Sequence, residues 1–267
     1  MKVGIIGCGN LGKALVKGLL YTDVNPQDIR INVKTEQTKE RVKAEFPDVC
    51  VIGEKRELVE WADAVIVVVE PKNAAEVLRE VGTCDLSGKC VISFMAGITR
   101  EEIKQMLGEQ GEKACLVRVM PNVSIANGKG ILGITYDVPV QPVLQEILRM
   151  FDKLGYVLKV EEEGLNTITV TAASGLAFAA SMLNAYQNAG NTLLENEEAS
   201  REITLRVFEN VLDLIKKENL SFADLVARIA TKGGTTEAGM NALDQKAVTD
   251  AMTQCMKASY EKCKKIV

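Results

Sequence analysis

The feature that most constrains this chain is a glycine turn between a strand pattern and a helix pattern. Residues 1–6 include a short run of β-branched side chains, and residues 13–20 carry apolar side chains at helical spacing. The turn between them has the pattern Gly-x-Gly-x-x-Gly and consists of Gly7, Cys8, Gly9, Asn10, Leu11 and Gly12. A strand, such a turn and a helix, in this order, are the context that a dinucleotide-binding fingerprint requires.

Each glycine of the turn has its own steric role in a dinucleotide site. Gly7 allows the tight turn, Gly9 lets the backbone approach a pyrophosphate, and Gly12 lets the helix pack closely on the strand. The helix N-terminus would offer unpaired N–H groups and a partial positive charge to the phosphates. The alternative is an ordinary strand-to-helix turn, but both flanking patterns favour the dinucleotide site.

The end of the second predicted strand, residues 29–33, bears on which dinucleotide is bound. In NAD sites an acid about 20 residues past the glycines binds the ribose hydroxyls. Here the region holds Asn32, Lys34 and Thr35 instead, which suits a 2′-phosphate. We therefore expect NADP, with NAD as the alternative, because a shift of one residue would bring Glu36 to the site. The alternative is that Lys34 is a solvated surface lysine.

Further apolar runs predict a parallel sheet. They lie at residues 49–52, 64–69, 89–93, 114–119, 128–136 and 155–160. The run at 64–69 is almost unbroken, which is typical of a strand buried on both faces. Because the carboxyl ends of such strands face the ligand crevice, we expect Val69 and Pro71 beside the cofactor.

The second half of the chain is predicted to be helical. Helical patterns cover residues 165–195, 198–218, 221–230, 235–243 and 246–265. The first of these is rich in small side chains over residues 172–185, which allow close approach of a second helix or a ligand. An apolar helix of this kind would otherwise expose a large patch, so we expect an obligate dimer.

The loop at residues 231–236 stands out among these helices. Gly233 and Gly234 would expose backbone N–H groups, and Thr235 and Thr236 add hydroxyl donors at a helix N-terminus. This composition suits a carboxylate or a phosphate. The alternative is an ordinary interhelical turn in which Thr235 is the N-cap.

Composition excludes several classes of function. The chain has no histidine, which removes serine–histidine and cysteine–histidine nucleophiles and histidine metal sites, and we expect no metal. The seven cysteines form no C-x-x-C pair and are expected to be reduced. The net charge of −4 does not suggest a nucleic acid or a membrane surface as partner. No apolar run is expected to reach the roughly 18 residues of a membrane span, and a strand beginning at Lys2 leaves no room for a signal peptide, so we expect a cytoplasmic protein.

Several motifs together resemble the pyrroline-5-carboxylate reductase family. They are the glycine turn, Ser93 with Ala96-Gly97, Met120-Pro121-Asn122, Ser174-Gly175, and Gly233-Gly234-Thr235-Thr236 with Gly239. They occur in the family's order over nearly the whole chain. The resemblance implies NAD(P)H-dependent reduction of the cyclic imine 1-pyrroline-5-carboxylate to L-proline, the last step of proline biosynthesis.

The resemblance also implies an architecture and a set of site residues. It implies an α/β fold, with a Rossmann-type doubly wound sheet at residues 1–162 and an all-helical dimerisation and substrate domain at residues 163–267. The partner would be a second copy of the chain, in a homodimer that could assemble further. Ala96 and Gly97 would join the cofactor site. Thr236 would be catalytic, and the substrate would meet Asn122, Ser174 and the loop residues Gly233, Gly234, Thr235 and Thr236.

The chain departs from the family pattern at several positions. Glu70 replaces a lysine before Pro71, and Leu176 and Phe178 replace a proline and a tyrosine after Ser174-Gly175. Two alternatives follow: a divergent member that reduces another cyclic imine acid, and a nucleotide-binding regulatory relative without turnover. A 3-hydroxy-acid dehydrogenase would require a catalytic lysine near residues 170–180. That stretch has no lysine, which argues against this class of enzyme.

Overall fold

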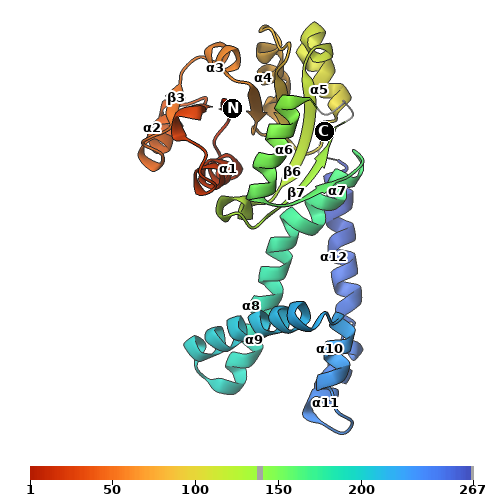
Figure 1. The fold of residues 1–267 in the computed structure, drawn as a ribbon. Helices are drawn as coiled ribbons and strands as arrows, with labels where there is room; N and C mark the ends of the chain where they lie inside the picture. Colours follow the sequence, from red (N-terminus) through yellow and green to blue (C-terminus); the bar gives the residue numbers. More distant parts are fainter. Residues whose placement is uncertain (137–140, 266–267) are drawn as a thin grey trace. The chain divides into compact units, whose positions relative to one another are not determined.

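The computed structural model describes residues 1–136 and 141–265, and its N-terminal part is a sheet flanked by helices (Figure 1). Residues 137–140 and 266–267, which fall within the two predicted domains, lie outside the described residues. The strands of the described part are β1 (Val3–Ile6), β2 (Ile29–Asn32), β3 (Cys50–Ile52), β4 (Ala64–Val67), β5 (Cys90–Ser93), β6 (Cys115–Pro121), β7 (Gly130–Thr135) and β8 (Gly155–Lys159).

Within the described residues these strands form one 8-stranded sheet in the order β3-β2-β1-β4-β5-β6-β7-β8. The pairs from β3 to β6 are all parallel, β7 is antiparallel to β6, and β8 is parallel to β7. The strand order reverses between β1 and β4, and ligands of doubly wound sheets bind at such a switch point, beyond the carboxyl ends of the strands. The predicted doubly wound sheet is confirmed.

Helices cover both faces of the sheet. The helices α1 (Asn10–Tyr21), α2 (Glu36–Glu45) and α6 (Pro142–Leu154) pack on one face through side chains such as Leu15 and Phe151. The helices α3 (Lys55–Trp61), α4 (Ala74–Val81) and α5 (Arg100–Leu107) pack on the other through side chains such as Leu58 and Leu78. Strand β4 is buried throughout and contributes Ile66 to the first core and Val65 and Val67 to the second. Burial on both faces explains its unbroken apolar run.

The chain divides into two compact units. The first comprises Met1–Ser174 and Ser259–Val267, and the second comprises Gly175–Ala258. The C-terminal segment belongs to the first unit, where the buried Cys263 thiol donates a hydrogen bond to Asn166 Oδ1 at 3.4 Å.

The second unit consists of helices. They are α8 (Gly175–Leu194), α9 (Glu197–Glu218), α10 (Phe222–Ile229), α11 (Thr235–Gln245) and most of α12 (Val248–Cys263). Helices α8 and α9 contact each other, and the Tyr186 and Phe208 rings meet edge to face at 5.5 Å. None of the described residues of α8 is buried. Large apolar side chains of this unit are exposed in the single chain, among them Leu176, Met182, Leu193, Leu212, Phe222 and Ile229.

One helical stretch is long and apolar enough to cross a membrane by length and composition alone. It runs from Gly164 to Leu194 and carries no charged residue. The expectation that no stretch of the sequence is long and apolar enough to span a membrane was therefore wrong. Small and weakly polar side chains interrupt the apolar residues of this helix, but they lower its mean hydropathy only slightly. Core and interface helices pass the same test, and 17% of the apolar window is buried in this chain.

Candidate functional site

The glycine turn has the steric form that a dinucleotide site needs. Gly7 adopts φ +97°, and a Cβ there would lie 2.4 Å from the Val68 carbonyl oxygen. A Cβ on Gly12 would lie 2.7 Å from the Gly7 carbonyl oxygen, so the helix packs too closely on the turn for a larger residue. A Cβ on Gly9 would meet no described atom within 4 Å. Gly9 thus faces open space, where the backbone can be approached by a ligand.

The N-terminus of α1 lies directly behind this open space. Gly9 is its N-cap, and in the described part of the chain no side chain caps this end. The first turn, Asn10 to Gly12, has no acidic residue. The first backbone N–H groups of a helix have no intrahelical partner, and together with the helix dipole they favour an anion. The residues present therefore fit a pyrophosphate.

A pocket of about 270 Å³ adjoins the turn. It lies at the carboxyl ends of β1, β2 and β4, where the strand order reverses. Of the residues predicted for the cofactor, Gly7, Cys8, Gly9, Asn32, Lys34 and Val69 line it. Asn10, Leu11, Gly12, Thr35, Pro71, Ala96 and Gly97 are not among its lining residues. Their predicted contacts with the cofactor stay predictions.

Some predicted residues outside the lining support it from behind. The Thr35 hydroxyl accepts a hydrogen bond from the Thr38 N–H as the N-cap of α2, and its Oγ1 lies 2.8 Å from Thr38 Oγ1. Pro71 opens a single 3₁₀ turn, Pro71–Asn73, whose flanking residue Glu70 and last residue Asn73 reach the pocket. Thr35 and Pro71 thus shape the backbone that places the side chains of Thr38, Glu70 and Asn73 in the lining of the pocket.

Sequence reasoning missed three polar lining residues, namely Thr38, Lys55 and Glu76. Two further polar residues of the lining, Glu70 and Asn73, belong to the turn around Pro71, which the sequence places near the cofactor. Glu70 pairs with Lys72 at 2.5 Å, and Lys55 pairs with Glu80 at 2.7 Å. Glu70 also stands out in the sequence as a departure from the family's lysine. Thr38, Lys55 and Glu76 come from the N-terminal turns of α2, α3 and α4, which meet at the switch point, and a pattern along the chain does not reveal this meeting.

Cys8 lies in the turn but is not a reactive thiol. Its side chain is buried, and burial raises the pKa of the thiol to about 11 against the lowering influence of Lys13. The thiolate is the nucleophilic form of cysteine, so this thiol stays protonated and inert near neutral pH. Cys8 therefore acts as a small residue that fills the turn.

Asn122, predicted for the substrate, is buried and fully engaged with backbone groups. Its Oδ1 accepts from the N–H groups of Ser124 and Ile131, each at 3.2 Å, and its Nδ2 donates to the Ala172 carbonyl at 3.1 Å. These bonds tie the end of β6 to the π-helical segment Thr169–Ser174, whose last residue is Ser174. Asn122 thus positions the backbone beside Ser174, and direct contact of either residue with substrate stays a prediction.

The loop with two glycines and two threonines holds a carboxylate of its own chain. Gly233 adopts φ +77°, and its N–H donates to Glu237 Oε2 at 2.8 Å. The N-cap of α11 is Gly234, and Thr235 is the first helical residue, so the alternative of Thr235 as N-cap is wrong. The backbone turns one residue earlier because Gly233 supplies the left-handed conformation.

A partly buried ion cluster joins β6, α5 and the segment before the helical half. Glu162 Oε1 accepts from Arg118 Nη1 at 2.9 Å and from the Arg100 N–H at 2.7 Å. Burial alone would raise the pKa of Glu162, but these donors outweigh it and hold the pKa below its usual 4.5. Arg118 is only 4% exposed, so this pair has a structural role.

Replacing Glu162 by glutamine is expected to lower the free energy of unfolding by about 3 kcal/mol near pH 7, because Arg118 would remain buried without a counter-charge. A group whose pKa is lowered by folding stabilises the fold above its unfolded pKa, and this contribution is lost as the pH falls through the folded value. Urea unfolding between pH 7 and pH 3 should show the deficit of Glu162→Gln shrinking below about pH 4.5. Glu161→Gln is the control, because Glu161 is the exposed residue next to Glu162, and it should change the free energy of unfolding by less than about 0.5 kcal/mol. A deficit that is independent of pH would contradict the assignment.

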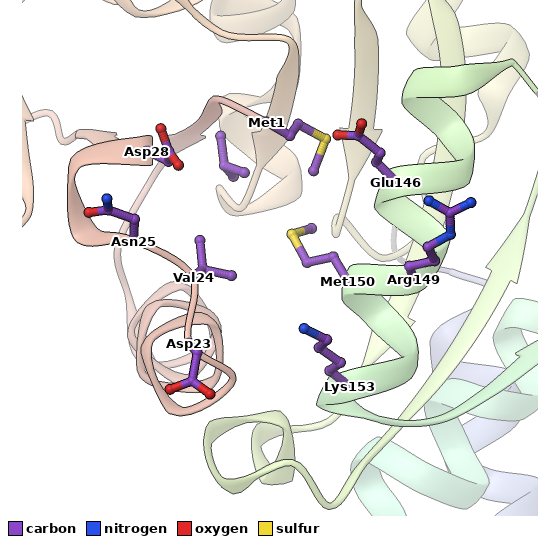
Figure 2. A pocket seen from close by; sticks show the side chains of 10 residues that line it. Met1, Asp23, Val24, Asn25, Asp28, Glu146, Arg149, Met150 and Lys153 are labelled. Atoms are coloured by element: carbon purple, nitrogen blue, oxygen red, sulfur yellow. The ribbon is translucent and has the colours of Figure 1, made fainter.

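A second hollow, of about 440 Å³, lies at the amino end of β1, beside Met1 (Figure 2). It lies between the connection from α1 to β2, with Val24 and Asn25, and the helix α6, from which Met150 and Lys153 point into it. It contains none of the predicted site residues. Ligands of such sheets bind at the opposite, carboxyl ends, so we leave this hollow outside the proposed site.

Comparison with protein families gives two matches. Residues 162–266 match a family model described as pyrroline-5-carboxylate reductase dimerisation. Residues 2–97 match a family model described as NADP oxidoreductase, coenzyme F420-dependent. The two matches cover the helical part and the first strands of the sheet.

Relatives and solved structures agree over the whole length. A pyrroline-5-carboxylate reductase of Aquifex aeolicus is 28% identical over 100% of this chain and 97% of its own length, and pyrroline-5-carboxylate reductase 2 of Bacillus subtilis is 26% identical over 99% and 95%. The structure of Plasmodium falciparum pyrroline carboxylate reductase with NADP bound has a TM-score of 0.88 at 21% identity and covers 100% of this chain and 98% of that one. The Streptococcus pyogenes 1-pyrroline-5-carboxylate reductase structure has a TM-score of 0.87 at 24% identity over 99% and 98%. These likenesses show a shared fold, and with the sequence matches they lead to one conclusion: the chain belongs to the pyrroline-5-carboxylate reductase family.

Proposed function

We propose that this chain reduces 1-pyrroline-5-carboxylate to L-proline with NADPH. The observation that carries the proposal is the open face of Gly9 over the uncapped N-terminus of α1, in a chain that matches pyrroline-5-carboxylate reductases from end to end. A related structure with NADP bound and the match to an NADP oxidoreductase family support the choice of cofactor. When bound, NADPH supplies the hydride that reduces the C=N bond.

The cofactor side of the reaction is assigned to the first unit. The turn from Gly7 to Gly12 would hold the pyrophosphate through backbone N–H groups. Lys34 would pair with a 2′-phosphate at the far end of the pocket, with Thr35 and Thr38 beside it. The residues after β4 and β5 would line the remaining length of the dinucleotide.

The substrate side is assigned to the loop before α11. A ring iminium is already electrophilic, so its reduction needs orientation more than a strong acid. The Gly233 N–H donates a hydrogen bond to the Glu237 carboxylate at 2.8 Å, and this contact supports the proposal that the loop binds the carboxylate of a substrate. Thr236, in the first turn of α11, would donate its hydroxyl to the ring nitrogen.

A second candidate is reduction of another cyclic imine acid. Leu176 and Phe178 stand where the family pattern has a proline and a tyrosine, and Leu176 is 41% exposed in the single chain. These replacements remove a hydroxyl and a rigid turn beside Ser174, and a changed ring size or substituent is the expected consequence.

The deciding experiment is a spectrophotometric assay of NADPH oxidation with 1-pyrroline-5-carboxylate and with six-membered and substituted cyclic imine acids. The proposal expects the highest kcat/KM for 1-pyrroline-5-carboxylate. Preference for another imine acid would support the second candidate. Cofactor binding without turnover of any imine would instead support a regulatory role.

The family match at residues 162–266 indicates homo-oligomerisation. We propose that the oligomer is a dimer formed by the C-terminal helices, because their exposed apolar side chains need a cover in water. A partner subunit packed on the uncharged helix at residues 164–194 would shield it from water without a membrane. We therefore propose a cytoplasmic location. We also propose that the chain comprises a dinucleotide-binding domain at residues 1–162 and a helical domain at residues 163–267.

Light scattering of the purified protein is therefore expected to give at least a dimeric mass at micromolar concentration. Replacing Leu212 or Ile229 by glutamate should shift the protein toward monomer, since a charge would be buried in the interface. Tyr21→Glu is the control, because Tyr21 is an exposed residue of the first unit, and this variant should have the same mass in solution as the unmodified protein. An active monomer of the unmodified protein would contradict the proposal.

A further inference from the structure

The ribose end of the cofactor pocket holds an acid that comes from an unexpected element. Both carboxylate oxygens of Glu76, on α4, face the Lys34 ammonium, at 3.3 and 3.5 Å. Lys34 and Glu76 both line the pocket, next to Thr38. Glu76 thus brings to the ribose end of the pocket the carboxylate that is absent from the end of β2, and it does so from α4, on the other side of the switch point.

The other polar groups at this end are largely engaged. The Asn32 side chain is buried and its Nδ2 donates to the carbonyls of Ile52 and Gly53, at 3.1 and 2.8 Å. Asn32 therefore holds β2 to β3 and has no amide hydrogen directed at a ribose. Lys55 is paired with Glu80 at 2.7 Å. Glu70, also in the lining, is paired with Lys72 at 2.5 Å. Among the described residues that line the pocket, the charged groups left to meet the 2′ position are therefore Lys34 and Glu76.

We propose that Glu76 sets the cofactor preference of this chain by opposing Lys34. With NADPH, Lys34 turns from Glu76 to the 2′-phosphate, and the Glu76 carboxylate is left close to a like charge. With NADH, the same carboxylate accepts a hydrogen bond from a ribose hydroxyl, as the acid after β2 does in NAD sites. Glu76 thereby lowers the preference for NADPH and enables the use of NADH.

The exchange of partners is energetically accessible. The side chains of Lys34 and Glu76 are 73% and 63% exposed, and exposed ion pairs are weak. Opening the pair therefore costs little compared with a new contact between Lys34 and a phosphate. The inference rests on the proposed dinucleotide site but not on the identity of the imine substrate.

The test measures the dissociation constants of NADPH and NADH for the full-length protein by calorimetry, without substrate. Glu76→Gln is expected to tighten NADPH and weaken NADH, raising the ratio of their affinities by about tenfold at low salt. Lys34→Gln is expected to lower that ratio, and the double variant should bind the two cofactors about equally. The shift caused by Glu76→Gln should shrink as the salt concentration rises.

Glu60→Gln is the matched control, because it makes the same change of charge in a carboxylate that pairs with Arg56 outside the pocket. It should leave both dissociation constants unchanged. If both cofactors bind but Glu76→Gln moves their ratio by less than twofold, or shifts both constants equally, Glu76 does not set the preference. If neither cofactor binds the unmodified protein, the dinucleotide site itself is refuted, and this inference with it.

Discussion

Replacing Thr236 by alanine is expected to lower kcat/KM for the imine by about ten- to a few hundredfold. The hydroxyl is assigned to the ring nitrogen, and a hydrogen bond to a charged group contributes roughly 1.5–3 kcal/mol. Each 1.36 kcal/mol in the barrier corresponds to about tenfold in rate. Steady-state kinetics with saturating NADPH measures the loss, and a change within twofold would refute the role of Thr236.

Two further measurements separate the hydroxyl from the loop that carries it. Thr236→Ser keeps the donor and should retain kcat/KM within a few fold. Thr235→Ala should lower kcat/KM less than Thr236→Ala does, because the Thr235 hydroxyl is not assigned to the ring nitrogen and Thr235 is not the N-cap of α11. The dissociation constant of NADPH should be unchanged in all three variants. If Thr236→Ala weakens NADPH as much as substrate, the loop binds the cofactor, and the imine site must be sought near Asn122 and Ser174.

Replacing Gly9 by valine is expected to abolish cofactor binding while leaving the fold intact. A Cβ on Gly9 meets no described atom within 4 Å, so the added methyl groups would occupy the space from which a pyrophosphate approaches the N–H groups of α1. Loss of two such charged hydrogen bonds would cost about 3–6 kcal/mol, or roughly 10²- to 10⁴-fold in the dissociation constant. Calorimetric titration with NADPH measures this loss, and thermal unfolding should show a Tm close to that of the unmodified protein.

Gly7→Ala provides the contrast. Gly7 adopts φ +97°, and its Cβ would lie 2.4 Å from the Val68 carbonyl oxygen, so this change should lower stability more than Gly9→Val does. Tight NADPH binding by Gly9→Val would show that the pyrophosphate does not lie over this turn. A large loss of stability in Gly9→Val would show that the space beside Gly9 is filled by the protein itself.

The sequence by itself determined the local elements and the sheet. The strand, turn and helix at residues 3–21 are specified by side chains that are neighbours along the chain, and the close contact of Gly12 with the Gly7 carbonyl oxygen lies within that same turn. The carbonyl oxygen that excludes a Cβ at Gly7 comes instead from Val68, after β4, so this constraint also depends on the tertiary structure. The apolar run of β4 predicted burial on both faces, and the sheet buries it in two cores. The helical second half also agrees with its predicted segments, because apolar spacing and caps are local signals.

Only the tertiary structure decided which polar side chains share the pocket. Glu76 lies 42 residues from Lys34, and they meet because the strand order places β2 and β4 on either side of β1. Asn32 and Asn122, both predicted for ligands, also hold backbone groups that are 20 and 50 residues away, a role that the sequence did not predict. Periodicity reports which face of an element is apolar, but it carries no information on which partner a polar group finds across the fold. That choice depends on the packing of whole elements, and it made Glu76 part of the candidate site.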